Sequence, residues 1–195
     1  MREVKGRLGA DGGGLIMEIA TTKLSGVYVI QPLVRGDARG SFTKTIQGGF
    51  FKERGLNTRF DEIYHSVSHS NVLRGLHFQI PPADGSKMVC CLSGTVHDVL
   101  LDLRRSSATY GQHLLVKLEG DKNQMVYMPA GVAHGFWVES GPSIMLYYQQ
   151  KEYAAQQDRG ILWNSAGIVW PCQNPIISDR DAAFPMLKDY VSPFG

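Results

Sequence analysis

Short apolar runs, separated by clusters of turn residues, fill the chain from about residue 62 to residue 150. Val, Ile, Leu, Phe and Tyr make up the runs, and Gly, Pro, Ser and Asp interrupt them. Short strands at regular spacing with this punctuation are typical of an all-β barrel or sandwich. The turns expected between the strands include Ser93-Gly94 and Gly141-Pro142. The pattern predicts strands at residues 62–69, 71–79, 87–92, 94–103, 112–119, 124–128, 134–139 and 143–150.

The two ends of the chain carry weaker signals. Residues 18–31 have a strand-like pattern, residues 36–42 predict a turn followed by a short strand, and residues 48–56 hold a weak helical signal. Ser178 is a good N-cap for a short helix that begins within residues 175–181. Together these patterns predict an all-β fold with a few short helices.

The first residues differ in composition from the rest. Residues 1–16 are rich in glycine and have no hydrophobic periodicity, which predicts a flexible leader. Residues 17–195 contain no repeat, low-complexity run or linker. We therefore expect one domain over residues 17–195.

Composition narrows the functional classes. The 195 residues are 43% hydrophobic and 19% charged, which is typical of a globular protein with a sizeable core. A net charge of +2 is too small to predict a nucleic-acid or membrane surface. No apolar run approaches the roughly 18 residues that span a bilayer, and no signal-peptide pattern is present. Three cysteines without Cys-x-x-C spacing predict reduced thiols and a cytoplasmic protein.

Basic side chains gather on one predicted strand and at the start of the next. Side chains alternate between the faces of a strand, so Gly75, His77 and Gln79 are expected on one face, with Arg74 at the strand's entrance. Lys87 opens the next apolar run. A guanidinium, an imidazole and an ammonium that converge on one cavity indicate an anionic substrate and a proton-transfer step. The alternative is that the arginine and lysine are surface charges and the histidine is a core residue.

A second segment, Pro129-Ala130-Gly131-Val132-Ala133-His134, places a histidine directly after a tight turn. It resembles the second motif of cupin jelly rolls, in which the turn points the histidine into the barrel. Metal-binding cupins supply His-x-His and a glutamate from the first motif, whereas this chain has His77-Phe78-Gln79 and then Lys87. A cation would oppose a metal ion, and two or three ligands are missing. We therefore expect a cupin-type barrel without a metal or other cofactor.

Several motifs together resemble the dTDP-4-dehydrorhamnose 3,5-epimerase family. The resemblance runs in the family's order from about Gly26 to Asp181, nearly the whole chain after the leader. The motifs that carry it are Arg74-Gly75-Leu76-His77-Phe78-Gln79, Lys87-Met88-Val89, Asp102-Leu103-Arg104-Arg105, the segment with His134-Gly135-Phe136, Leu146-Tyr147, Trp170-Pro171 and Ser178-Asp179-Arg180-Asp181.

The resemblance implies a chemistry. Members of the family epimerise a nucleoside-diphosphate-linked 4-keto-6-deoxyhexose without a cofactor, because the keto group acidifies the C–H bonds at C3 and C5. Carried over by motif, His77 is the base, Asp181 orients it, and Tyr147 is the acid on the opposite face of the sugar. Lys87 would stabilise the enolate oxygen. On the residues alone, Tyr148 remains an alternative to Tyr147, and Asp179 an alternative to Asp181.

The resemblance also implies substrate contacts. Arg74 and Arg39 match arginines that hold the diphosphate, and His134 matches a second pocket histidine. Gln79 shares the predicted face of His77. Phe42 is interpreted as a core residue, with stacking on a nucleobase as the alternative. The likeness further implies a homodimer in which the N-terminal segment reaches the neighbour's active site.

Two stretches depart from the family's pattern on the nucleotide side of the pocket. Lys44 stands where the family usually has an acid, and Glu62-Ile63-Tyr64 stands where it often has Gln-Asp-Asn. We therefore expect the same chemistry with a different nucleotide, sugar or stereocentre. The alternatives are a mono-epimerase, including one for a CDP- or GDP-linked sugar, and a non-catalytic sugar-binding cupin. A barrel isomerase that moves a keto group is disfavoured by the presence of both Lys87 and Asp181.

Overall fold

The computed structural model describes residues 16–195, and the expected leader lies outside these residues except for Ile16. The predicted all-β class with short helices is confirmed. That residues 17–195 form one domain stays a prediction. The strands are β1 (Glu18–Thr21), β2 (Tyr28–Gln31), β3 (Leu33–Asp37), β4 (Gly40–Lys44), β5 (Glu62–Ser68), β6 (Leu73–Gln79), β7 (Lys87–Asp102), β8 (His113–Glu119), β9 (Met125–Met128), β10 (Val132–Gln149) and β11 (Asp158–Gly160), and the helices are α1 (Gly48–Lys52), α2 (Asp179–Ala182) and the 3-10 helix η1 (Leu187–Asp189).

Two long strands replace four predicted short ones. The turns expected at Ser93-Gly94 and Gly141-Pro142 are wrong, because β7 and β10 continue through them and pair with each other along most of their length. The pairing shifts register around Ser140. Gly94 has a φ of +79°, and a Cβ there would lie 2.4 Å from the carbonyl oxygen of Ser140. These residues therefore form a sharp bend inside a continuous strand pair.

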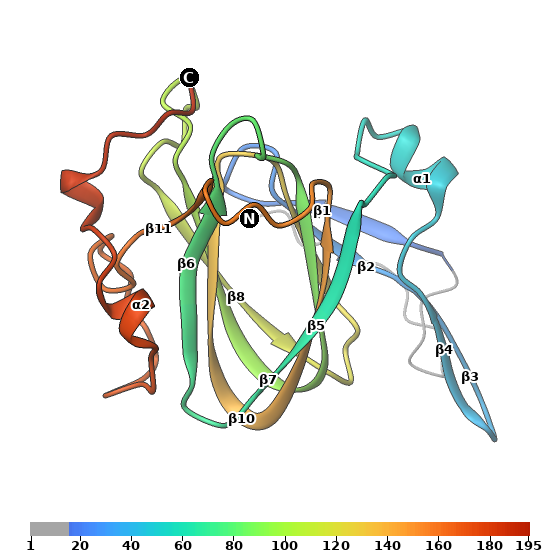
Figure 1. The fold of residues 1–195 in the computed structure, drawn as a ribbon. Coiled ribbons are helices and arrows are strands. Elements are labelled where there is room, and N and C mark those ends of the chain that lie inside the picture. Colours follow the sequence, from blue (N-terminus) through green and yellow to red (C-terminus); the bar gives the residue numbers. More distant parts are fainter. Residues whose placement is uncertain (1–15) are drawn as a thin grey trace.

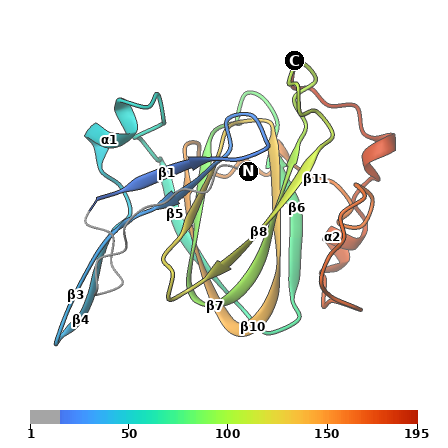
Figure 2. The same ribbon diagram turned by 180° about the vertical axis from the view of Figure 1, so that it is seen from behind.

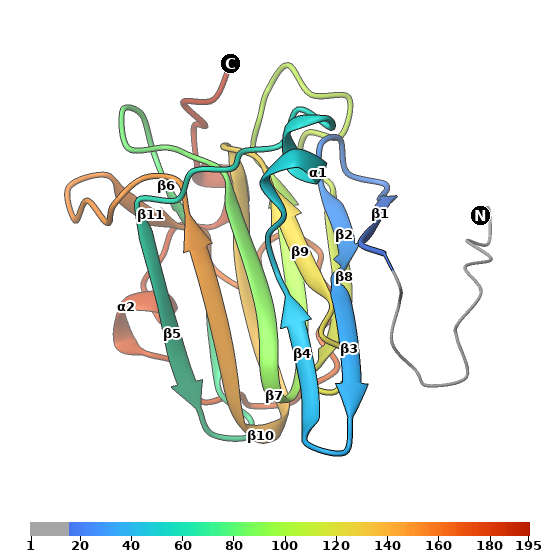
Figure 3. The same ribbon diagram turned by 90° about the vertical axis from the view of Figure 1, so that its right-hand side faces the viewer.

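The bend divides the barrel into two layers. The first half of β7 pairs with β9, and the second half of β10 pairs with β5. Beyond the bend, β7 pairs with β8 and β10 pairs with β6, which carries β11 at its far edge. All of these pairings are antiparallel, and Figures 1 and 3 show the two layers facing each other around an interior. This is the jelly-roll arrangement of the cupin fold, as expected.

Both faces of β7 are buried, which explains its nearly continuous apolar sequence. Val89, Val96 and Leu100 point into the barrel, where they pack with residues of β9 and β10. Met88 and Cys90 point outward and pack against Phe51 of α1 and its neighbours. Past the bend, the outward side chains pack against the C-terminal segment, including Trp170 and Phe194. The three cysteines are free thiols, as predicted.

The periphery has two distinct sides. Figures 1 and 2 show α2 and the C-terminal segment alongside β6 and β11, and the β3–β4 hairpin projecting from the other side of the barrel. The hairpin is a separate two-stranded sheet. Helix α2 begins at the predicted N-cap, because the Ser178 hydroxyl accepts a hydrogen bond from the backbone N–H of Asp181. In residues 16–195, no helix is long and apolar enough to cross a membrane.

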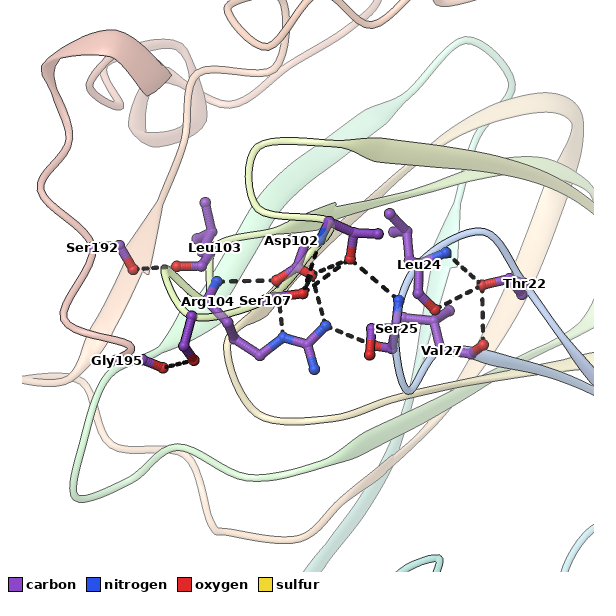
Figure 4. A network of polar contacts seen from close by, with 12 residues as sticks. Thr22, Leu24, Ser25, Val27, Asp102, Leu103, Arg104, Ser107, Ser192 and Gly195 are labelled. Atoms are coloured by element: carbon purple, nitrogen blue, oxygen red, sulfur yellow. Dashed lines mark hydrogen bonds and ion pairs between the residues drawn. The ribbon is translucent and has the colours of Figure 1, made fainter.

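A polar network fastens the segments at one end of the barrel (Figure 4). Asp102 is buried and accepts hydrogen bonds from the Arg104 guanidinium and from the hydroxyls of Ser107 and Thr109. Arg104 also donates to the carbonyl oxygen of Ser25. Asp102 is therefore a structural partner of Arg104. At the other side of the network, the Ser192 hydroxyl donates a hydrogen bond to the carbonyl oxygen of Leu103, the residue after β7. This bond holds the C-terminal segment against the barrel.

Candidate active site

A cavity of about 220 Å³ opens between the two layers of the barrel. Its walls come from the consecutive strands β5, β6 and β7 and from β10, which follows later in the chain. The lining residues are Tyr64, Ser66, Arg74, His77, Lys87, His134, Gly135, Phe136 and Tyr147. The structure thus brings together five of the residues singled out from the sequence: Arg74, His77, Lys87, His134 and Tyr147.

A bulge in β6 turns both Arg74 and His77 toward the cavity. In a regular strand, residues three apart point to opposite faces. Here His77 pairs with His134, whereas Arg74 pairs with Phe136, so three steps on β6 match two steps on β10. The extra residue on β6 restores a common face.

Two glycines make this bulge possible. A Cβ on Gly75 would lie 2.5 Å from the Cα of Gly135, and a Cβ on Gly135 would lie 2.7 Å from the carbonyl oxygen of Arg74. Gly75 also has a φ of +127°, a conformation that L side chains rarely adopt. The two backbones therefore touch, which explains why a glycine precedes the histidine by two residues in one motif and follows it in the other.

His77 and Asp181 form a hydrogen-bonded pair. Nε2 of His77 lies 2.9 Å from Oδ1 of Asp181, and the other carboxylate oxygen accepts a hydrogen bond from the backbone N–H of Gly75. Burial opposes ionisation of Asp181, but the bonds from His77 and Gly75 outweigh burial and lower the pKa of the carboxyl. Because a carboxylate only accepts hydrogen bonds, Nε2 is assigned the proton and Nδ1 the lone pair. Asp179, the alternative partner, makes no such contact within the described residues.

The position of the His77 ring is also fixed by packing. Phe184, which follows α2, contacts the imidazole edge-on at a centroid distance of 5.6 Å. Gly160 on β11 leaves room for this phenyl ring, since a Cβ at that position would lie 2.2 Å from a ring carbon. The C-terminal segment therefore supplies both the carboxylate and an aromatic wall for the histidine.

Lys87 and Arg74 bring positive charge to the cavity. Burial lowers the pKa of Lys87, and the negative charges of Asp158 and Glu62 act in the opposite direction. Nε of Arg74 donates a 3.0 Å hydrogen bond to the Ser68 hydroxyl, which orients the guanidinium at the cavity wall. Both groups are suited to hold an anion or to stabilise negative charge that develops during a reaction.

Tyr147, not Tyr148, faces the cavity. Its hydroxyl lies 3.3 Å from the hydroxyl of Ser66, and its ring stacks on that of Tyr64. Burial raises the pKa of Tyr147, so the phenol stays protonated at neutral pH. The neighbouring Tyr148 points to the other side of the sheet, where its hydroxyl contacts that of Thr45.

His134 lies deeper and is paired with Asp98. Nε2 of the histidine is 3.3 Å from Oδ1 of the aspartate, and neither side chain has a well-aligned hydrogen-bond partner among residues 16–195. Burial, together with the electrostatic effects of Lys87 and His77, lowers the pKa of His134 to about 3. Burial raises the pKa of Asp98 well above its usual value. Burial therefore favours the uncharged form of both groups in this pair.

Other residues singled out from the sequence lie elsewhere. The Gln79 side chain hydrogen-bonds the backbone of Ala83, Glu152 and Ala154, so it organises a loop instead of lining the cavity. Glu62 accepts hydrogen bonds from Gln149 and from the backbone of Tyr153.

Three expected substrate contacts are on the projecting hairpin. Arg39, Phe42 and Lys44 belong to the β3–β4 segment and do not line the cavity of their own chain. Arg39 is paired with Asp37, and its side chain is 90% exposed. Arg39 and Phe42 line a separate hollow together with Arg35.

The sequence did not single out Tyr64 or Ser66 as partners of Tyr147, and it left Asp98 without a role. The alternation of Tyr64 and Ser66 on β5 was a usable signal, because residues two apart share a face. Their contact with Tyr147 depends on the β5–β10 register, which no local pattern gives. In residues 16–195, no group of three or more His, Cys, Asp or Glu side chains is arranged to hold a metal ion.

A hydrogen-bonded His–Asp pair, a protonated tyrosine and a partly buried lysine in one cavity of a cupin-type barrel are the groups that an isomerase working by proton transfer requires. The profile of the dTDP-4-dehydrorhamnose 3,5-epimerase family matches residues 21–189. The chain therefore belongs to the dTDP-4-dehydrorhamnose 3,5-epimerase family, which confirms the resemblance seen in its motifs.

Individual relatives agree with this assignment. The dTDP-4-dehydrorhamnose 3,5-epimerase of Shigella flexneri is 39% identical over 85% of this chain and 93% of its own length. The Legionella pneumophila dTDP-6-deoxy-D-glucose-3,5-epimerase, solved with dTDP-4-keto-L-rhamnose, has a TM-score of 0.84 at 34% identity, covering 88% of this chain and 93% of that one. A 3′-monoepimerase from Streptomyces bikiniensis, solved with dTDP-quinovose, has a TM-score of 0.81 at 27% identity, covering 86% of each chain.

Proposed function

We propose that this protein epimerises a dTDP-linked 4-keto-6-deoxyhexose at both C3 and C5. The observation that carries the proposal is the His77–Asp181 pair, held at 2.9 Å beside a cavity that Lys87 and Tyr147 also line. The names of the relatives support dTDP as the nucleotide. The product would serve deoxysugar or polysaccharide biosynthesis.

The first half of the reaction breaks a C–H bond. Nδ1 of His77 takes the proton from the carbon next to the keto group, and the bonding electron pair moves into the ring to form an enolate. The negative charge collects on the former keto oxygen, where the ammonium of Lys87 stabilises it. Asp181 stabilises the imidazolium that His77 has become.

The second half forms a C–H bond on the opposite face. The O–H bond of Tyr147 breaks and its proton goes to the carbon, while the enolate electron pair makes the new C–H bond and restores the ketone. The phenolate of Tyr147 and the imidazolium of His77 then return to their starting states by proton exchange with water. Substrate and product have the same composition, so no oxidant or reductant is consumed.

The substrate's diphosphate requires cations. Arg74 supplies one from within the chain, and we propose that Arg39 supplies another across a homodimer. In that arrangement the β3–β4 hairpin of one chain would carry Arg39, Phe42 and Lys44 to the neighbour's cavity, where the aromatic ring could stack on the base. The full exposure of the Arg39 side chain supports this use of the hairpin. A cytoplasmic location, where nucleotide sugars are made, belongs to the same proposal.

The proposal is tested by proton NMR in deuterium oxide with dTDP-4-keto-6-deoxyglucose. Loss of both the C3 and the C5 signals is expected, because each centre exchanges its proton with solvent during inversion. Loss at one centre would indicate a mono-epimerase instead, the activity named for the Streptomyces relative. Exchange only with CDP- or GDP-linked keto sugars would contradict the assignment of dTDP, and binding without exchange of any keto sugar would favour a non-catalytic protein.

A further inference from the structure

Strand β5 presents two side chains to Tyr147. Tyr64 lies directly opposite Tyr147 in the β5–β10 pairing, and Ser66 lies opposite Met145. Because they are two residues apart, Tyr64 and Ser66 share one face of β5, and both line the cavity. Neither takes part in the proton transfers described above.

The two contacts restrain Tyr147 in different ways. The rings of Tyr64 and Tyr147 are nearly parallel, at 10°, with centroids 4.6 Å apart. Such a stack limits rotation of the second ring about its side-chain bonds. The hydroxyl of Ser66, 3.3 Å from that of Tyr147, restrains the direction of the O–H bond. A ring contact and a hydroxyl contact together fix where the phenol proton points.

We propose that Tyr64 is a positioning residue that aims the phenol of Tyr147 at the substrate carbon. This inference rests on the proposed function, since it assigns to Tyr147 the role of acid. A general acid works only within hydrogen-bond reach of the atom it protonates, and a misplacement of about 1 Å can cost about 100-fold in rate.

The surroundings of Tyr64 indicate that it acts through its ring. Burial and the negative charges of Glu62 and Asp158 raise the pKa of Tyr64 to about 12, so its own phenol keeps its proton at neutral pH. The side chain is still partly exposed at the cavity wall, so replacing it removes little of the core. The stack, and not the Tyr64 hydroxyl, is therefore the part that should matter.

The test compares Tyr64→Phe, Tyr64→Leu and Tyr64→Ala in deuterium oxide with the keto-sugar substrate of the wild-type enzyme. Two quantities are measured: the rate of inversion, and the amount of deuterium in substrate recovered without inversion. Without the stack, protonation of the enolate by Tyr147 is slower. His77, which has exchanged its proton for deuterium from the solvent, then returns a deuteron to the face of the sugar from which it took the proton. Tyr64→Leu and Tyr64→Ala should slow inversion about 10- to 100-fold while label without inversion increases. Tyr64→Phe, which keeps the ring, should match the wild type within about twofold.

A merely structural role would lower exchange and inversion together, and would leave their ratio unchanged. That result in both Tyr64→Leu and Tyr64→Ala, or wild-type behaviour in both, would overturn the inference. A Tyr64→Phe variant as defective as Tyr64→Ala would also overturn it, because the hydroxyl would then be the important group.

Tyr110→Ala is the matched control, since Tyr110 is a partly exposed tyrosine outside the cavity lining. A wild-type protein that exchanges no keto sugar would contradict the proposed function itself and remove the role given to Tyr64.

Discussion

At the scale of single residues, two His–Asp pairs face the same interior, but their surroundings shift the pKa of the two carboxyls in opposite directions. In the His77–Asp181 pair, hydrogen bonds from His77 and Gly75 outweigh the effect of burial and lower the pKa of the carboxyl, which favours its ionised form. In the His134–Asp98 pair, burial favours the neutral form of both partners. Two pairs of the same composition are thus prepared for different tasks by their surroundings.

The neutral pair predicts how stability depends on pH. The pKa of His134 falls from 6.5 to about 3 on folding, so the histidine alone would make the folded state less stable as pH falls below 6.5. The raised pKa of Asp98 means that the folded state keeps a proton that the unfolded state loses above about 3.8. Between about pH 4 and 6.5 the two effects cancel, because each state then holds one proton on the pair.

Asp98→Asn should remove this cancellation. Relative to wild type, the variant should lose about 1.4 kcal/mol of unfolding free energy for each pH unit between 6.5 and 4. Urea titrations of both proteins at several pH values would measure the difference. A difference that is independent of pH would show that the pair is not neutral in the folded protein.

At the scale of elements, the bulge in β6 decides whether the site exists. Without it, Arg74 and His77 would point to opposite faces of the sheet. The motif spacing indicated that both belong to one site, but alternation alone does not allow it. The contact between Gly75 and Gly135 supplies the missing geometry. This explains why residue types could be predicted from the sequence while their convergence required the paired strands.

Gly75→Ala should therefore be far more damaging than an alanine at another glycine of positive φ. Gly111 is the matched control: its φ is +72°, and a Cβ there meets nothing within 4 Å. Gly111→Ala should cost about 1 kcal/mol of unfolding free energy, from backbone strain alone. Gly75→Ala adds a clash with the Gly135 backbone and should cost several times more, or prevent folding. Similar denaturation midpoints for the two variants would contradict the account of the bulge.

The strands show which structural features the local pattern of apolar and turn residues predicts and which it does not. Apolar runs and turn residues located the strand segments between residues 62 and 150, because burial on a pleated surface imposes both signals, but they did not predict β11. Ser93-Gly94 and Gly141-Pro142 have the composition of turns, yet the chain only bends there, because β7 and β10 stay paired across the bend. Gln79 carried the right alternation for the cavity, but its amide is used by nearby backbone groups. Partners of this kind depend on tertiary register, which a single sequence does not encode locally.

At the scale of the whole molecule, the β3–β4 hairpin carries residues that were expected to contact the substrate but that lie outside the cavity of their own chain. Arg39 and Lys44 lie on the β3–β4 hairpin, and neither of these basic residues lines the cavity of its own chain. Hydrogen bonds and packing hold the C-terminal segment, by contrast, against the barrel that contains its own site. A homodimer would give the hairpin a use, since closed two-fold dimers are the commonest assemblies.

Subunit complementation tests this arrangement. Chains with Arg39→Ala and chains with His77→Asn are co-expressed with different tags, and the mixed dimer is purified. If the hairpin completes the partner's site, one of the two sites contains neither change, and the mixed dimer should have about half of the wild-type activity. If each chain completes its own site, the mixed dimer should be as impaired as its parents. Light scattering that gives a monomer of 21.6 kDa would exclude a shared site.

The most direct test of the central claim compares wild type with His77→Asn in two experiments. Proton NMR in deuterium oxide follows exchange at C3 and C5 of the keto sugar, and calorimetry follows the binding of dTDP. If His77 is the base, the variant should lose exchange at both centres by about 100- to 10,000-fold while its affinity for dTDP changes little. A variant that still exchanges at the wild-type rate would show that another group removes the proton, and would contradict the account.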